Sequence, residues 1–213
     1  MSENRDQKFS VRLFTSSHGL ASHHFPKALA RVFKENSLIE YPVVDAVGGR
    51  VMHEDFVAYY KQEFEKIKQT RKPTISILLL GDNNIRRYAV VGAFRVYQHT
   101  KEITELHKGT CHPLLVCGLV PSPKTIPQSG ILCEHVDDVL QKMINDLHCD
   151  PAGRLFGYVC TTSFFVDEQG FVIEKKHFAK DGIHLNELGA HVLALHLLAN
   201  AKMLADSVLK YQV

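Results

Sequence analysis

The chain has 213 residues, of which 45% are hydrophobic and 23% are charged. This length and apolar content exclude a disordered chain and are sufficient to bury a core, so we expect one domain over residues 9–213 after a flexible N-terminus at residues 1–8. The net charge of +2 does not require a nucleic acid or an anionic membrane as a partner.

Short apolar, β-branched runs alternate with amphipathic segments along the chain. The runs, which we expect to form strands, are residues 9–14, 39–47, 74–81, 113–120 and 155–161. The segments that we expect to form helices are residues 18–36, 55–69, 85–107, 131–147 and 186–210. This alternation predicts an α/β fold, a three-layer α/β/α sandwich around a five-stranded parallel sheet with the flavodoxin-like order 2-1-3-4-5.

Three sequence features bear on cellular location. No apolar stretch reaches the roughly 20 residues that a membrane span needs, and the polar start MSENRDQKFS lacks the pattern of a signal peptide. An odd number of scattered cysteines without a CxxC pair favours a reducing compartment. We therefore expect a cytoplasmic protein. The cysteines are Cys111, Cys117, Cys133, Cys149 and Cys160.

Polar residues and glycines follow the expected strands, and chemistry in parallel sheets belongs at this carboxyl edge. Ser17 follows the first strand, where a hydroxyl can act as a nucleophile. Asp181 and His184 lie three residues apart in a glycine-containing turn, so the carboxylate can orient the imidazole as a base. The N–H groups of Ser17 and Gly49 and the side-chain amide of Asn83 can stabilise an oxyanion.

Each of these residues also has an ordinary structural interpretation. Ser17 could be a helix N-cap, the Gly48-Gly49 pair could be a turn, and Asp181-Gly182 could be a turn before a helix. The complementary roles of four segments at one edge of the sheet favour acyl transfer over these separate interpretations.

Four motifs resemble those of the SGNH hydrolases, the GDSL-like esterases and lipases. They are Phe14–His18, Val47–Arg50, Leu80–Asn84, and Asp181–Asn186 followed by Gly189. The resemblance implies a serine esterase that hydrolyses short acyl or acetyl esters without a cofactor. Within the family, the chain is most similar to compact esterase domains associated with retroelement open reading frames. It departs from the family pattern where Thr15-Ser16 replaces Gly-Asp and where Asn84 replaces an aspartate.

Further residues in or close to these motifs are candidates for pocket or anion contacts: His18, Gly48, Arg50, Asn84 and Arg86. No metal site is expected, because the histidines do not pair with cysteines or carboxylates at ligand spacing. The expected partner is a small ester, and the oligomeric state is open. The main alternative is a catalytically silent SGNH-like domain that binds RNA or protein. A flavodoxin-like nucleotide binder is disfavoured, because no glycine-rich phosphate loop follows the first strand.

Overall fold

The apolar runs form one parallel sheet in a computed structural model, which describes residues 8–34, 36–123, 129–147, 155–167 and 174–210. The strand order is β2-β1-β3-β4-β5, and all neighbouring strands are parallel, which confirms the predicted order 2-1-3-4-5. The strands are β1 (Ser10–Thr15), β2 (Val43–Ala46), β3 (Thr74–Leu79), β4 (Leu114–Cys117) and β5 (Phe156–Val159).

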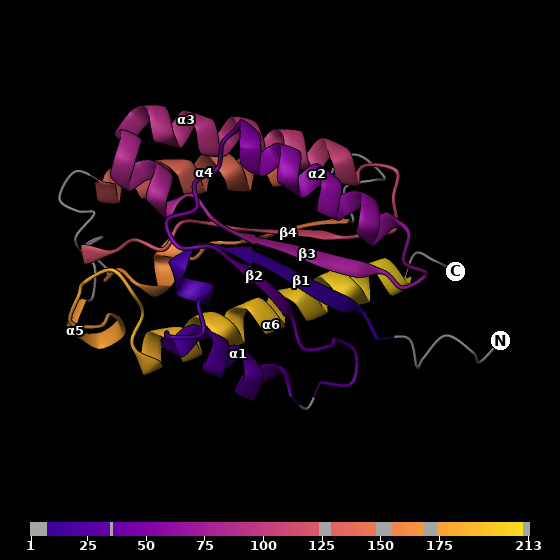
Figure 1. Cartoon of the computed structure of the whole chain (residues 1–213), viewed down its shortest axis with the longest axis horizontal. Helices are drawn as coiled ribbons and strands as arrows, with labels where there is room; N and C mark the ends of the chain where they lie inside the picture. The colour runs from indigo at the N-terminus through magenta and orange to yellow at the C-terminus, as the bar shows by residue number, and fades with distance from the viewer. Residues whose placement is uncertain (1–7, 35, 124–128, 148–154, 168–173, 211–213) are drawn as a thin grey trace.

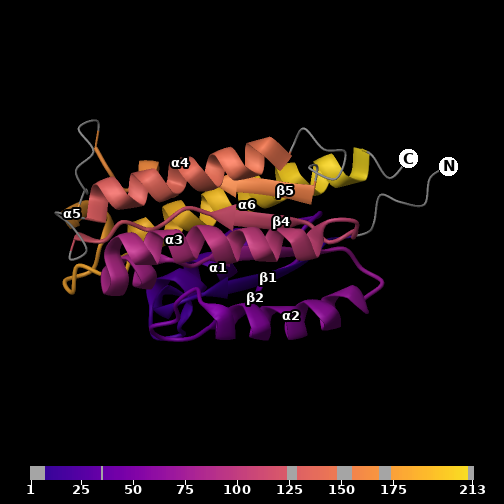
Figure 2. The same cartoon turned by 90° about the horizontal axis from the view of Figure 1, so that it is seen from above.

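Helices cover both faces of the sheet (Figure 1, Figure 2). The helices α2, α3 and α4 lie on one face, whereas α1 and α6 lie on the other (Figure 1). The helices are α1 (His24–Phe33), α2 (Glu54–Lys68), α3 (Asp82–His107), α4 (Ser129–Leu147), α5 (Glu174–His177) and α6 (Glu187–Lys210), with 3-10 turns η1 (Ser17–Gly19) and η4 (Thr162–Phe164).

The largest differences from the predicted elements lie before β3. The helix expected at residues 18–36 is divided into η1 and the shorter α1, so that Pro26 falls in the first turn of α1, where its missing N–H costs no hydrogen bond. The strand expected at residues 39–47 is reduced to β2 and an isolated bridge between Phe9 and Ile39. Pro42 separates these two pieces and cannot donate to the sheet.

Helix α3 starts earlier than expected and contains a kink. It begins at Asp82 after Gly81, whose φ of +121° is accessible to glycine. Ala89 interrupts the helical backbone with a φ of +46°, so residues 82–88 form a separate first segment that starts at the carboxyl end of β3.

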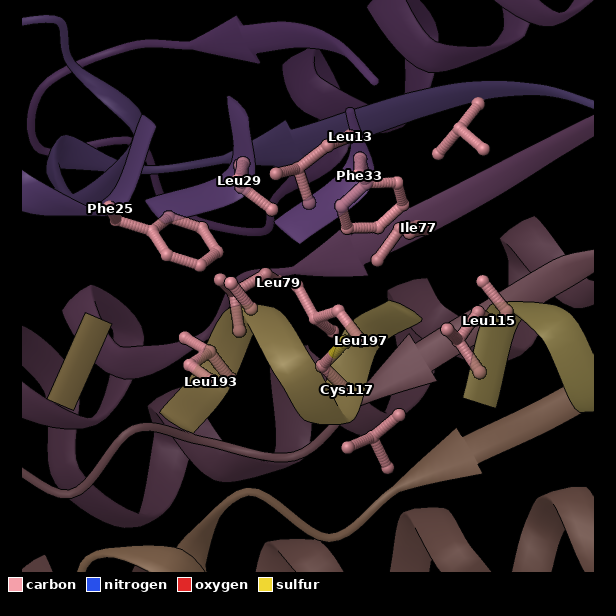
Figure 3. Close-up of a cluster of buried hydrophobic side chains, with 14 of the residues drawn as sticks. Leu13, Phe25, Leu29, Phe33, Ile77, Leu79, Leu115, Cys117, Leu193 and Leu197 are labelled. Carbon is pink, nitrogen blue, oxygen red and sulfur yellow. The ribbon is translucent and has the colours of Figure 1, made fainter. Parts of the chain in front are cut away.

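The core on the α1 and α6 face includes side chains from β1, β3, β4 and β5 and from these two helices (Figure 3). Leu13, Ile77 and Leu115 contribute from the sheet, and Leu29 and Leu197 from the helices. By length and composition alone α6 could cross a membrane, but its buried apolar side chains belong to this core, as in the core helix of a globular protein.

Some predictions fall on residues that the structure does not describe. Residues 1–7 of the predicted flexible N-terminus and Cys149 lie outside the described residues. Lys8, the first described residue, donates from Nζ to the carbonyl of Asn36.

Candidate active site

Ser17, His184 and Asp181 meet at the carboxyl edge of the sheet. The Oγ of Ser17 lies 2.9 Å from Nε2 of His184, and Nδ1 of His184 lies 2.6 Å from Oδ2 of Asp181. A carboxylate only accepts hydrogen bonds, so Nδ1 carries the ring proton and Nε2 is left to accept from the Ser17 hydroxyl. This is the arrangement in which an imidazole can take a proton from a serine.

The turn that carries Asp181 and His184 is held by its own backbone. Oδ1 of Asp181 accepts from the N–H groups of Ile183 and His184, at 2.9 and 3.0 Å. Gly182 has a φ of +64°, and Ala179 donates to the carbonyl of His184 at 2.8 Å. Burial alone raises the pKa of the Asp181 carboxyl, but the hydrogen bonds from His184 and the two amides outweigh it and lower the pKa well below its usual value. Asp181 is therefore ionised beside His184.

Ser17 is placed by η1, directly after β1. Ser16 is fully buried, and its Oγ donates to Oδ1 of Asp82 at 3.3 Å. Ser16, one of the two residues that depart from the family pattern, thus acquires a carboxylate partner from the start of α3. The Gly19 backbone packs so closely on Thr15 that a Cβ at Gly19 would lie 2.2 Å from the threonine methyl group.

The predicted oxyanion donors are at the ends of β1, β2 and β3. Among the described residues, neither the N–H of Ser17 nor that of Gly49 donates to an acceptor. Asn83 is buried, its Nδ2 donates to the carbonyl of Arg50 at 3.0 Å, and its Oδ1 accepts from Arg86 at 2.5 Å. Because an amide nitrogen carries two hydrogens, one N–H of Asn83 remains for an oxyanion.

Arg50 and Asn84, predicted as pocket or anion contacts, both form hydrogen bonds within the protein. Arg50 donates to the Asp45 carboxylate at 2.7 Å and to the carbonyl groups of Asp45 and Thr15. Asn84 is fully buried and binds the backbone of Met52 through both of its polar groups, at 2.7 and 2.8 Å. The Asn84 bonds hold the loop after β2 against the start of α3, whereas Arg50 also lines the open hollow beside Gly49.

The remaining predicted contacts lie around this loop and beside His184. Gly48 is exposed and lines an open hollow next to Gly49. The Arg86 side chain is exposed to solvent, and its guanidinium donates a hydrogen bond to Asn83. His18 is buried, its Nε2 lies 3.7 Å from Oδ2 of Asp82, and its ring meets His184 edge-on with the centroids 5.6 Å apart. Burial lowers the pKa of His18, although the Asp82 carboxylate opposes this shift.

His23 is a residue of the site that the sequence did not indicate. Its ring stacks on His184 with the centroids 3.9 Å apart and an interplanar angle of 15°. Burial and the neighbouring His184 both lower the pKa of His23, which disfavours the protonated form of its ring. No spacing rule connects His23 with His184, because the loop before α1 brings the two rings together.

The described part of the chain shows no metal centre: it contains no group of three or more His, Cys, Asp or Glu side chains placed to hold a metal ion. The arrangement of hydroxyl, imidazole, carboxylate and N–H donors needs no metal to activate a serine.

Comparisons with known proteins bear on the fold. No protein-family model matches the sequence, and no curated protein matches it. Among solved structures, the carbohydrate acetylesterase Est24 from Sinorhizobium meliloti superimposes with a TM-score of 0.65 at 11% identity, over 92% of this chain and 100% of that one. The M. smegmatis aryl esterase has a TM-score of 0.64 at 13% identity, over 92% and 99% of the two chains.

A third match carries the family name. A GDSL-like lipase from Bacteroides thetaiotaomicron has a TM-score of 0.61 at 12% identity, over 92% of this chain and 87% of that one. At such identities the likeness concerns the course of the backbone, and it extends over nearly the whole chain. The protein therefore has the α/β/α fold of the SGNH hydrolases.

Proposed function

We propose that this protein is a serine ester hydrolase that acts on short acyl or acetyl esters. The observation that carries the proposal is the chain of two hydrogen bonds from Ser17 through His184 to Asp181, at 2.9 and 2.6 Å. The three residues come from the two ends of the chain and form a path for proton transfer. If Ser17 were only a helix N-cap and Asp181 only part of a turn, these two hydrogen bonds would not be needed.

In the proposed reaction His184 Nε2 takes the proton of the Ser17 hydroxyl as the oxygen attacks the ester carbonyl. Asp181 holds the ring in the required tautomer and stabilises the imidazolium that forms. The N–H groups of Ser17 and Gly49 and the remaining N–H of Asn83 bind the oxyanion, while His184 returns its proton to the leaving alcohol. A water activated by His184 then releases the acyl group.

The names of similar structures support a small acyl group. One is called an acetyl xylan esterase and another a carbohydrate acetylesterase. In this chain Ser17 is half-buried, and the hollow lined by the proposed oxyanion donor Gly49 is open with a volume of about 360 Å³, which suits a short acyl group better than a long one.

Hydrolysis of p-nitrophenyl acetate tests the proposal. We expect Ser17→Ala and His184→Ala each to reduce kcat/KM by about 10³-fold or more, because either change removes proton transfer from the nucleophile. Ser163→Ala is the matched control, since Ser163 is an exposed serine in η4. A Ser17→Ala variant as active as the wild type would contradict the proposal.

A further inference from the structure

An open hollow lies beside Gly49, one of the proposed oxyanion donors. Its volume is about 360 Å³, and its walls come from the loop after β2, the start of α2 and the first segment of α3. The residues that matter for its chemistry are Gly49, Phe56, Tyr59 and Arg87. A hollow of this size next to an oxyanion hole can receive the part of a substrate that flanks the ester carbonyl.

Arg87 brings a positive charge to this hollow. Its Nη2 lies 2.8 Å from the position that a Cβ on Gly49 would occupy, so the guanidinium packs directly on the Gly49 backbone. The Gly49 φ of +71° and the absence of a side chain allow this approach. An anion bound by Arg87 would therefore lie close to a carbonyl held by the Gly49 N–H.

The acidic groups around the hollow leave this charge without a counterion. Among the described residues, Arg87 forms no salt bridge. Asp45 is bound by Arg50 and by the hydroxyl of Tyr59. Asp55 is fully exposed and faces His53 at 3.6 Å. The hollow thus has an unpaired guanidinium in its wall.

Arg86, the preceding residue, adds a second positive charge at the other oxyanion donor. Its Nη2 donates to Oδ1 of Asn83 at 2.5 Å, and this polarises the amide that we propose as an oxyanion donor. Asp82, the acid at the start of the same helix, faces Ser16 and His18 instead. The two consecutive arginines therefore each contact a different oxyanion donor.

We propose that Arg87 selects esters that carry an anionic group, a carboxylate or a phosphate, close to the ester carbonyl. The proposal rests on the proposed esterase function and names its substrate class. A planar guanidinium presents paired N–H donors that match the oxygens of a carboxylate or phosphate. The size of the hollow fits a small anionic group better than a polymer, and the anion can belong to the acyl part or to the alcohol part of the ester.

Matched pairs of esters test the preference and locate the charge. The acyl arm compares mono-p-nitrophenyl succinate with its methyl ester, and the alcohol arm compares 4-acetoxybenzoate with its methyl ester. In one arm we expect the anionic ester to have the higher kcat/KM in the wild type. In that arm we expect Arg87→Gln to reduce the ratio of kcat/KM for the anionic ester to kcat/KM for the neutral ester about five- to tenfold. Higher ionic strength should reduce the same ratio.

Arg71→Gln is the control for the change in net charge, because Arg71 is exposed and precedes β3, at the opposite edge of the sheet. We expect it to leave both ratios unchanged. If the wild type hydrolyses the neutral esters but Arg87→Gln leaves the kcat/KM ratio of anionic to neutral ester unchanged in both arms, the anion proposal is overturned and the esterase function stands.

A binding measurement separates this inference from catalysis. Calorimetric titration of the Ser17→Ala variant with mono-p-nitrophenyl succinate and 4-acetoxybenzoate requires no turnover. We expect one of them to bind about five- to tenfold more tightly than its methyl ester, and we expect the added Arg87→Gln change to remove this difference. Equal affinity for the charged and neutral esters would refute the anion site, whether or not the wild type is active.

Discussion

Asn84 stands where the family pattern has an aspartate, and restoring that aspartate should destabilise this protein. The Asn84 side chain is fully buried, accepts from the N–H of Met52 at 2.7 Å and donates to the carbonyl of Met52 at 2.8 Å. An Asn84→Asp variant keeps an acceptor for the N–H, but it places a carboxylate oxygen against the carbonyl oxygen. The loop that carries Gly49 would lose one of its two bonds to Asn84.

The size of the effect follows from the lost bond and the new charge. An unsatisfied buried carbonyl costs about 1–3 kcal/mol, and a buried carboxylate without a cationic partner adds to this cost. We therefore expect the free energy of unfolding of Asn84→Asp to fall by about 3 kcal/mol at pH 8. Burial raises the pKa of the new carboxyl, and a protonated carboxyl can again donate to Met52. The deficit should accordingly shrink as the pH falls, by at most about 1.4 kcal/mol per pH unit below the raised pKa.

Urea denaturation at pH 8 and pH 5 measures this effect. Asn84→Ala is the control, because it loses both bonds but introduces no titrating group, so its deficit relative to the wild type should be the same at both pH values. Two results would refute the reasoning: an Asn84→Asp variant as stable as the wild type at pH 8, or a deficit that is equal at both pH values.

Three further changes probe the site, the core and the backbone. Asp181→Asn should lower kcat about 10⁴-fold with little change in stability, because the amide favours the wrong tautomer of His184; a loss below tenfold in p-nitrophenyl acetate hydrolysis would contradict its role. Burial lowers the pKa of His107 to about 3 from 6.5, so its contribution to stability is complete above pH 6.5 and is lost as the pH falls toward 3, at about 1.4 kcal/mol per unit. In urea titrations, the free energy of unfolding of His107→Gln should fall less steeply between pH 6.5 and 3 than that of the wild type, and equal falls in the two proteins would count against this argument. A Cβ at Gly81 would lie 2.5 Å from a Leu119 methyl group at a φ of +121°, so Gly81→Ala should cost about 2–4 kcal/mol of unfolding free energy, whereas the unobstructed Gly109→Ala should cost about 1; equal losses would rule out the steric argument.

The sheet was predictable because its strands have a simple sequence signature. The run that contains β3 is apolar at every position of Thr74–Leu79 except Thr74 and Ser76, and all six residues are buried. Such a run fits only a strand that is covered on both faces. The right-handed connection of successive strands through helices then limited the possible strand orders.

The triad residues could be proposed from sequence because each follows a predicted strand or lies in a short turn with a fixed spacing. Their mutual distances depend on the tertiary fold and could not be read from the sequence. The same limit explains why the buried hydrogen bonds of Asn84 were not predicted, since its partner Met52 lies 32 positions away in the chain. The stacking of His23 on His184 joins residues 161 positions apart, and no local pattern indicates it.

Labelling with a fluorophosphonate probe tests the central claim most directly. The folded wild-type protein is treated with the probe, digested and analysed by mass spectrometry to locate the phosphonylated residue. Our account predicts one modified serine, Ser17, whose labelling is lost in His184→Ala and retained in Ser163→Ala. Labelling of a different serine would contradict the account, and no labelling in the folded wild type would contradict it and favour a catalytically silent binding domain.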